Sequence, residues 1–571
     1  MKIDYKWVVL VNTTLGMLMA AINQTIVLIS LPAIFSGLHV DPLAPGQSSL
    51  LLWMLMGYSA MTTVLLVTFG RIADMFGRVR VYTIGFIVFT IGSLLCAVTP
   101  STGSAGAVEL IGFRMVQGLG GACLFANSIA ILTDAFPASQ RGFALGINQI
   151  AFIAGNLVGV VLGGALAAIN WRLDFLVSVP VGVLGTVWAF FALHEVGERR
   201  RQPLDWIGNL TFAFGLLALM YALTEALSPY GNQSMGWSNP VVEAGLIAGV
   251  VLLGLFAYFE KRTAYPMFEL SLFRIRAFLF GNVAAFLFSL ARGGLQFMFI
   301  IWLQGIWLPL HGVSYANTPL QAGLDTMPLM IGFVLCGPFG GWLSDRYGAR
   351  GLATSGILIV ALAAGLLSTL PADFSLWQFG AYLFLMGAGM GLFSAPNTSQ
   401  IMGAVPAEHR GSASGMRATV LNAGMTASQA IFFTIVIGGL AGSFGPALES
   451  GARAAGLPAP IAHGLSALPP GAAIFSAMLG YDPIAHLVSA SALSSLGPAV
   501  AARLVDPHFF AGILAQPFVV GIRAALVACI AMCVLAAAVS ALRGSSRADL
   551  PVGKPAANAA EGRPEELLEA T

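Results

Sequence analysis

The chain has 571 residues, of which 57% are hydrophobic and only 9% are charged, and its formal net charge is +2. A soluble protein carries about 25% charged residues, so this composition excludes a soluble fold and indicates that much of the surface faces lipid. The net charge does not support nucleic-acid binding, because basic residues occur in twos and threes between apolar runs.

Roughly fourteen apolar segments are long enough to cross a membrane as helices, which needs about 20 residues each. We predict helices rather than strands because these runs are long and uniform, and because unsatisfied backbone groups are costly in lipid. The predicted fold class is therefore an all-α polytopic membrane protein. In chain order the span cores are 8–34, 49–69, 81–99, 109–132, 144–168, 175–193, 207–226, 240–259, 278–305, 322–343, 352–370, 376–402, 414–440 and 517–541.

Lysine and arginine predict the orientation of these spans. With the N-terminus inside, 21 of the 27 basic residues fall in inner loops and tails, whereas the short outer loops hold Arg172 and little else. The positive-inside rule then places both termini in the cytoplasm, which agrees with an even number of spans. No small-residue cleavage site follows the first apolar run, so we expect a retained first span and a multi-pass protein of the cytoplasmic (inner) cell membrane.

Two polar motifs occur twice. FPASQRGFALG matches VPAEHRGSASG with an offset of 269 (Pro137 to Pro406), and GRIADMFGR matches GWLSDRYGAR with an offset of 271 (Asp74 to Asp345). Both pairs lie in predicted inner loops. Two motifs in matching register indicate two homologous halves in the same orientation, a known arrangement of membrane transporters. Each half needs six spans to carry both motifs, which leaves the seventh and eighth spans as an inserted pair.

Several segments carry signatures at defined places. GRIADMFGRVR follows the second span, LIGFRMVQGLGGA lies in the fourth, GNLVGVVLGG lies in the fifth, LDWIGN opens the seventh and FSAPNTSQIM ends the twelfth. Over residues 1–440 and the last span, the chain resembles the major facilitator superfamily and, within it, the fourteen-span drug:proton antiporters. The resemblance implies a major facilitator fold of two six-helix bundles plus two additional helices.

The predicted domains follow from the repeat and the resemblance. Residues 1–195 form the N-terminal six-helix bundle and residues 196–276 form the inserted helix pair with its linkers. Residues 277–541 form the C-terminal bundle, which includes a long extracytoplasmic segment at 441–516, and residues 542–571 form a disordered cytoplasmic tail.

The first span contains AAINQTIVLISLP. In the antiporter family the matching signature has an aspartate at the position of Asn23. An asparagine cannot take up and release a proton, so the coupling carboxylate that the resemblance implies is missing. The remaining candidates for proton coupling are Asp325 and Glu109, alone or with Arg114, while Asn23 and Gln24 are expected to hydrogen-bond substrate.

The loop after the second span has two interpretations. It is either a positive-inside anchor with a tight turn at Gly77 or, as the resemblance implies, a conformational gate. In the gate, Asp74 at a helix N-terminus is held by the helix dipole and by arginine in one state and released in the other. The predicted gating residues are Gly70, Asp74, Gly77 and Arg78, with Asp345 and Arg346 as the weaker counterpart in the second half.

Arg114 lies inside the fourth span. A cation at the centre of a bilayer costs at least about 2.5–3.5 kcal/mol, so it is expected to face a cavity or a partner. Gln117 follows one turn later. Arg114 is either a structural residue bonded to backbone carbonyl groups or, as the resemblance implies, linked to the proton or the substrate.

The fifth span carries glycines at one-turn intervals, namely Gly155, Gly159, Gly163 and Gly164. Such a stripe favours close helix packing. The resemblance adds a kinked contact between the halves that resists leak. The family's proline after the central glycine is Val160 here, which leaves the packing possible and argues against the kink.

Arg292 in the ninth span is a second intramembrane arginine, with Gln296 one turn later and Phe297, Trp302 and Trp307 nearby. This combination suits an amphiphilic, anionic or zwitterionic ligand, although Trp307 also fits an interfacial aromatic belt. The predicted substrate-binding and translocation residues are Asn23, Gln24, Arg114, Gln117, Gln149, Arg292, Gln296 and Asn422.

Residues 441–516 are rich in Ala, Gly, Pro, Ser and Leu. Their pieces AAIFSAML and ASALSSLGPAVAARL are predicted to form short amphipathic helices on the outer membrane face. The segment is a candidate site for an extracytoplasmic partner, and the alternative is a lid over the outer vestibule.

No metal or cofactor site is predicted. The chain lacks a Gly-x4-Gly-Lys-Ser/Thr loop, which disfavours a drive by ATP. Its five cysteines lie in apolar segments without metal-ligating neighbours, so we also expect no disulfides. They are Cys96, Cys123, Cys336, Cys529 and Cys533.

The sequence therefore predicts a secondary active transporter, not an enzyme, that exports amphiphilic drug-like or lipid-like molecules by alternating access with proton antiport. Its expected partners are the substrate, membrane lipid and the proton gradient, and we expect a monomer. The alternative is a proton-independent facilitator or a dedicated lipid or metabolite exporter, which Asn23 and Val160 favour. A membrane enzyme or sensor is disfavoured, because the spans hold no His/Asp/Glu or Ser/His catalytic grouping.

Overall fold

The computed structural model describes residues 4–41, 43–44, 47–137, 140–196, 205–226, 228–231, 235–263, 266, 268–406, 409–481, 484, 488, 500–501, 504 and 506–543. It leaves the side chains of residues 48, 141–143, 345, 410–411 and 507 undescribed. The predicted tail 542–571 lies almost wholly outside the described residues, as does most of the predicted segment 441–516 beyond residue 481.

Fourteen helical stretches of the described residues are long and apolar enough to cross a membrane, and each overlaps a predicted span. The prediction of an all-α polytopic membrane protein is thereby confirmed. The first twelve elements are α1 (Tyr5–Leu38), α2 (Gln47–Phe76), α3 (Arg78–Ala97), α4 (Gly103–Ala135), α5 (Arg141–Ala167), α6 (Leu173–Leu176), α7 (Ser178–Ala192), α8 (Trp206–Glu225), α9 (Pro240–Glu260), the 3-10 turn η1 (Leu270–Arg274), α10 (Arg276–Trp302) and the π-helical turn η2 (Leu303–Trp307). They are followed by α11 (Leu308–Leu310), α12 (Thr318–Asp325), α13 (Met327–Tyr347), α14 (Ala349–Ser368), α15 (Leu376–Gly403), α16 (Arg410–Ala454), α17 (Ala459–Leu465), α18 (Pro470–Leu479) and α22 (Pro507–Ala541).

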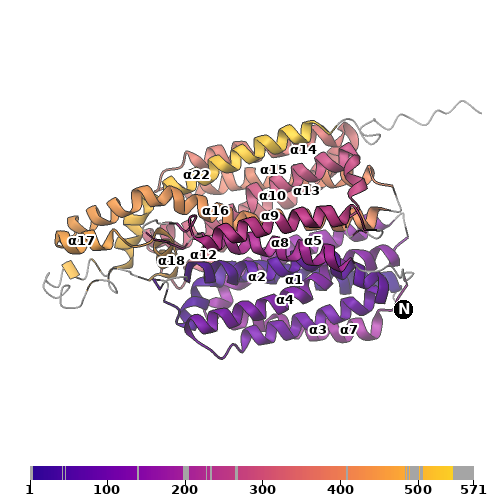
Figure 1. The fold of residues 1–571 in the computed structure, drawn as a ribbon, viewed down its shortest axis with the longest axis horizontal. Coiled ribbons are helices and arrows are strands. Elements are labelled where there is room, and N and C mark those ends of the chain that lie inside the picture. The colour runs from indigo at the N-terminus through magenta and orange to yellow at the C-terminus, as the bar shows by residue number, and fades with distance from the viewer. Residues whose placement is uncertain are drawn as a thin grey trace, which may run out of the picture.

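The long helices run side by side along the long axis of the molecule (Figure 1). We call the end at which α1 begins the proximal end and the opposite end, where α17 and α18 lie, the distal end. Successive spans alternate in direction, so both copies of the polar motif, around Pro137 and Pro406, lie at the proximal end. The matching register of the repeat thus places its two copies on the same face.

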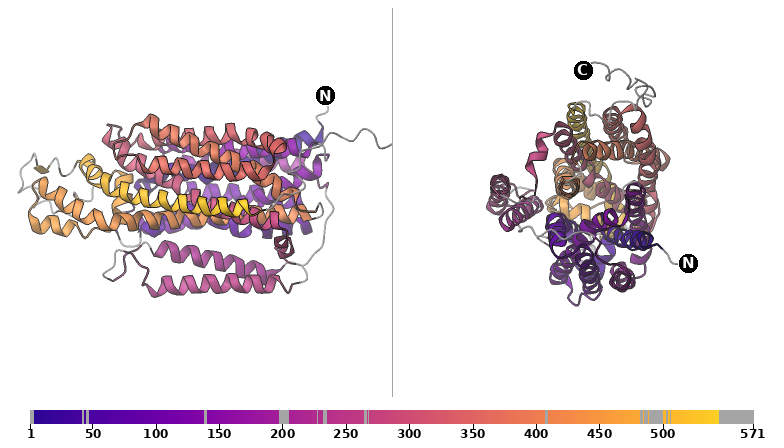
Figure 2. Two further views of the ribbon diagram at one scale, coloured as in Figure 1. Left: turned by 90° about the horizontal axis from the view of Figure 1, so that it is seen from above. Right: turned by 90° about the vertical axis from the view of Figure 1, so that its right-hand side faces the viewer.

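The spans form two groups and a separate pair. Helices α1 to α7 pack mainly on one another, and so do α10 to α22. Helices α8 and α9 pack mainly on each other and lie to one side of the two groups (Figure 2). The pair is attached through α8, whose Thr224 hydroxyl accepts a 3.0 Å hydrogen bond from the Trp53 indole of α2.

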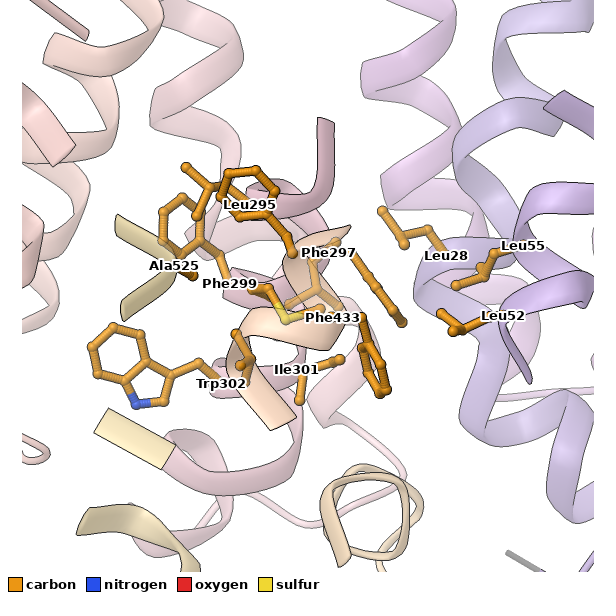
Figure 3. Packing of buried hydrophobic residues seen from close by; sticks show 14 of the residues in the cluster. Leu28, Leu52, Leu55, Leu295, Phe297, Phe299, Ile301, Trp302, Phe433 and Ala525 are labelled. Carbon is orange, nitrogen blue, oxygen red and sulfur yellow. The ribbon is translucent and has the colours of Figure 1, made fainter. Parts of the chain in front are cut away.

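An apolar core fills the space between the two groups. Leu28 of α1 and Leu52 and Leu55 of α2 come from the first group, and Phe297 of α10 and Phe433 of α16 come from the second (Figure 3). All five belong to one contiguous cluster of buried residues. Apolar burial therefore contributes to holding the two groups together.

The segment after the thirteenth span is more ordered and more deeply placed than predicted. Helix α16 continues to Ala454 rather than ending near residue 440. The piece AAIFSAML lies in α18, whose residues 470–478 are all buried. Because α18 contacts α1 and α2 as well as η2, α16 and α22, it does not lie on the membrane face; the alternative of a lid over the distal end fits this helix. The piece ASALSSLGPAVAARL lies mostly outside the described residues.

Candidate functional site

A buried polar network lies at the centre of the first group of helices. The Arg114 guanidinium donates to the Gln117 side-chain oxygen at 2.6 Å and to the backbone oxygen of Asn23 at 3.2 Å. The Gln117 amide nitrogen donates to the Asn23 side-chain oxygen at 2.9 Å and to the Ser93 hydroxyl at 2.7 Å. The Asn23 amide nitrogen in turn donates to the Ser178 hydroxyl at 2.6 Å. Four helices, α1, α3, α4 and α7, are linked by these bonds.

Small residues on α4 and α3 make this network possible. A Cβ added at Gly92 would lie 2.6 Å from the backbone nitrogen of Gln117, and one at Gly120 would lie 2.4 Å from that of Phe89. The close approach carries Arg114 into the bundle, where its side chain is 1% exposed. Its guanidinium also lies 4.9 Å from the Tyr58 ring centroid, which adds a cation–π contact.

The geometry of Arg114 matches the structural interpretation of this residue, because two of its nitrogens are bonded to a backbone carbonyl group. Asn23 uses both its donor and its acceptor, so its neighbours fit an amide rather than a carboxylate. The replacement of the family's aspartate is therefore accommodated by the surrounding hydrogen bonds.

Arg292 lies in the second group and has a different environment. It is half-buried, and its Nη2 lies 3.5 Å from the Met425 sulfur of α16. Among the residues described, no carboxylate pairs with it. Gln296 and Asn422 are also half-buried, and Asn422 donates to the backbone oxygen of Ala418 at 2.9 Å. An arginine that contacts a thioether retains its capacity to bind an anionic group.

The other predicted substrate residues lie in mixed environments. Gln24 is half-buried and Gln149 is exposed. Asn148, the residue before Gln149, is buried instead, and its side-chain amide donates to the Ser128 hydroxyl at 3.1 Å. Of the predicted set, the structure brings Asn23, Arg114 and Gln117 into direct contact.

The glycine stripe of α5 packs on α1. A Cβ added at Gly155, Gly159 or Gly163 would lie 2.6–2.7 Å from a backbone oxygen of that helix. Gly164 is different, because its Cβ would lie 2.5 Å from the Cα of Leu320 in α12 of the other group. Close packing on α1 therefore explains three of the four glycines, and a contact between the two groups of helices explains the fourth. Helix α5 is continuous from Arg141 to Ala167.

At the proximal end, Arg78 bridges two carboxylates. It donates to Asp74 at 2.9 Å and to both carboxyl oxygens of Asp134 at 2.7 Å. Gly77 has a φ of 112°, and a Cβ there would lie 2.3 Å from the Glu195 carboxylate. Gly70 lies one turn before Asp74 on α2, where a Cβ would meet only Ala126, at 4.0 Å.

One detail of the predicted gate is wrong. Asp74 lies in the last turn of α2 and not at a helix N-terminus, so the helix dipole does not stabilise its charge. The carboxylate at the N-terminus of α3 belongs to Glu195, which accepts bonds from the backbone nitrogens of Arg78 and Arg80 at 3.0 Å. Sequence reasoning missed Glu195 because its contact with α3 spans more than 110 residues.

The second half repeats the turn. Gly348 has a φ of 86° and precedes α14 as Gly77 precedes α3, with the same offset of 271 residues as Asp74 and Asp345. Arg346 lies 4.3 Å from the ring centroid of Trp342. The side chain of Asp345 lies outside the described part of the chain.

The acidic candidates are not bonded to Arg114 in the described part of the chain. Glu109 accepts a bond from the Ser101 backbone nitrogen at 3.3 Å, and Asp325 accepts one from Gln321 at 3.0 Å. Sequence reasoning missed Asp174, a carboxylate with no exposed surface. It directly precedes the predicted core of the sixth span at 175–193 and therefore does not count among the intramembrane charges predicted from the sequence.

Comparison with known proteins agrees with this architecture. The Major Facilitator Superfamily model matches residues 13–291 and 211–429. The riboflavin transporter RibZ of Clostridioides difficile is 28% identical over 75% of this chain and 87% of its own length. Multidrug resistance protein 3 of Bacillus subtilis is 27% identical over 75% and 79%. Multidrug resistance protein Stp of Mycobacterium tuberculosis is 30% identical over 77% and 78%.

Solved structures share the fold at low sequence identity. A bacterial homologue of the human lysosomal transporter Spinster, in an inward-facing and unoccupied conformation, aligns with a TM-score of 0.56 at 18% identity. The alignment covers 96% of this chain and all of that one. The D-xylose–proton symporter aligns with a TM-score of 0.50 at 15% identity over 75% of this chain and 88% of its own.

Proposed function

The chain belongs to the Major Facilitator Superfamily, and from this premise we propose that it exports amphiphilic small molecules by alternating access with proton antiport. It is a multi-pass transporter of the cell membrane and not an enzyme. Its relatives include proteins named for multidrug resistance and a tetracenomycin C resistance and export protein. These names support export rather than uptake.

The environment of Arg292 is the observation that carries the proposed substrate class. Arg114 is fully buried and its acceptors lie within the protein. Arg292 is half-buried, and its guanidinium contacts the Met425 sulfur atom. A half-buried guanidinium with Gln296 one turn later, on a helix that also carries several aromatic residues, suits a ligand with an anionic end and an apolar body.

The contacts between the groups support alternating access. The Gln304 amide of η2 donates to the backbone oxygen of Ile29 in α1 at 3.3 Å, and Gly164 and Gly323 contact the opposite group at Leu320 and Val160. All these contacts lie in the distal half. At the proximal end, within the described residues, the Arg78 cluster links helices of the first group only.

Transport in lipid vesicles tests this proposal. We expect vesicles that contain the purified chain to move anilinonaphthalene sulfonate, a fluorescent amphiphilic anion, when a pH gradient is imposed, and a protonophore to stop this movement. Arg292→Ala should abolish transport of the anion. Arg262→Ala is the matched control, because Arg262 is exposed and contacts Tyr258 in the α8–α9 pair.

Two results would redirect the proposal. If Arg292→Ala retained the wild-type rate, the anion site would lie elsewhere. If transport survived the protonophore, the alternative of a proton-independent facilitator or a dedicated lipid or metabolite exporter would replace proton antiport. That alternative draws on the amide network around Asn23, which contains no carboxylate, and on the relative named as a riboflavin transporter.

A further inference from the structure

Asp174 is a buried carboxylate without a hydrogen-bond partner. Its side chain has no exposed surface, and within the described residues neither carboxyl oxygen accepts a hydrogen bond. The hydroxyl of Ser30 approaches this carboxyl group, but it donates instead to the backbone oxygens of Ile26 at 2.8 Å and Gly163 at 3.2 Å. Burial of an ionised carboxylate without a partner is very costly, so this arrangement suits the protonated acid.

The position of Asp174 relates it to the Asn23 network. Asp174 lies in α6, four residues before Ser178, so the two side chains share one face of the sixth span. Ser178 accepts a hydrogen bond from Asn23 in α1, and Ser30 near Asp174 lies two helical turns beyond Asn23. Asp174 therefore lies against α1, the helix in which the family's carboxylate is replaced by Asn23, at a position closer to the distal end.

The charged groups on the surrounding helices leave Asp174 uncompensated. Helix α6 packs on α1, α3, α5 and α7. The titratable groups of these helices are Tyr5 and Lys6 of α1, Arg78, Arg80, Tyr82 and Cys96 of α3, and Arg141 of α5, whose side chain is not described; α7 has none. The adjacent Arg172 donates to the backbone oxygen of Thr99 at 2.9 Å and stacks on Trp171. Of the groups whose side chains are described, only Cys96 lies near the distal end of its helix.

Arg114 is the buried cation in the same bundle as Asp174. It and Asp174 are the two buried charged side chains among the described residues of α1 to α7. The Arg114 guanidinium lies 5.9 Å from the ring centroid of Phe175, the residue that follows Asp174, and its Nε has no acceptor. A carboxylate formed at Asp174 would have this guanidinium as the closest buried cation of its bundle.

We propose that Asp174 is the proton-binding group of this transporter and replaces the acid that is missing at Asn23. One carboxyl oxygen takes up one proton when the distal contacts open, and the neutral acid then suits the closed, buried state seen here. Loss of the proton leaves a buried carboxylate, and Arg114 is the buried cation of the same bundle. The inference rests on the proposed proton antiport.

Infrared spectroscopy tests proton binding independently of transport. We expect pH-difference spectra of the full chain in lipid vesicles to contain a carboxylic acid band that is lost in Asp174→Asn and shifted in Asp174→Glu. The band should persist in Glu109→Gln and Asp325→Asn, the matched controls. Asp174→Asn should also lose transport of anilinonaphthalene sulfonate driven by a pH gradient and retain its exchange without a gradient.

The outcomes separate this inference from the proposed function. A band unchanged in Asp174→Asn and Asp174→Glu, or wild-type gradient-driven transport in both variants, would overturn the role of Asp174 and leave antiport standing. If the band depended on Asp174 but transport did not respond to the pH gradient, Asp174 would remain a proton-binding site and antiport would be rejected. If Asp174→Asn did not fold, the shifted band of Asp174→Glu would decide the matter.

Discussion

At the scale of single residues, Gln117 is central to the buried polar network. It accepts a bond from Arg114 at 2.6 Å and donates to Asn23 and Ser93. A buried group left without its partner costs about 1–3 kcal/mol, and more when it is charged. The stability of the protein should therefore depend more on this glutamine than on the half-buried polar residues near Arg292.

We expect Gln117→Leu to lower the free energy of unfolding by about 2–4 kcal/mol, because it removes the side-chain acceptor of a buried arginine. The measurement is thermal unfolding in detergent. Gln296→Leu is the matched control, since Gln296 is half-buried in the second group and its loss should change transport but not stability. Equal unfolding temperatures for Gln117→Leu and the wild type would contradict this view of the network.

At the scale of secondary-structure elements, the α1–α5 contact depends on the absence of side chains. The three glycines that face α1 allow its backbone to approach within van der Waals distance of α5, and in lipid such close packing replaces the hydrophobic effect as a source of helix association. The continuous α5 helix shows that this contact does not need the proline that Val160 replaces.

We expect Gly159→Ala to destabilise the protein, because its methyl group would lie 2.3 Å from the Thr25 hydroxyl and 2.6 Å from the Ile22 backbone oxygen. Gly146→Ala on the same helix is the control. It has no neighbour within 4 Å and should be neutral or gain up to about 1 kcal/mol from helix propensity. The measurement is the thermal unfolding temperature of each variant. Equal unfolding temperatures for the two variants would refute the packing role of Gly159.

At the scale of the whole molecule, the number of spans and the twofold repeat could be predicted from the sequence. Apolar runs of span length can cross lipid in few conformations other than a helix. The repeated sequence motif forms the same turn in both halves, with a positive φ at Gly77 and at Gly348. The extent of α16 could not be predicted, because residues 441–454 contain Gly and Pro446 and resemble a loop. The burial of α18 and Asp174 depends on contacts between distant segments, which local composition does not encode.

The central claim is that the two groups of helices separate at the distal end during transport. In the structure they meet there through α5 and α12, where a Cβ at Gly323 would lie 2.8 Å from a methyl carbon of Val160. The methyl carbon lies one bond from the Val160 Cβ, so the two Cβ atoms lie within reach of a disulfide, whose Cβ atoms are about 3.5–4.5 Å apart.

The most direct test is transport by the Val160→Cys, Gly323→Cys double variant in lipid vesicles, before and after oxidation. We predict that the oxidised protein does not transport, that reduction restores transport, and that either single variant is unaffected by oxidant. Transport by the fully cross-linked protein at the rate of its reduced form would contradict alternating access in this molecule.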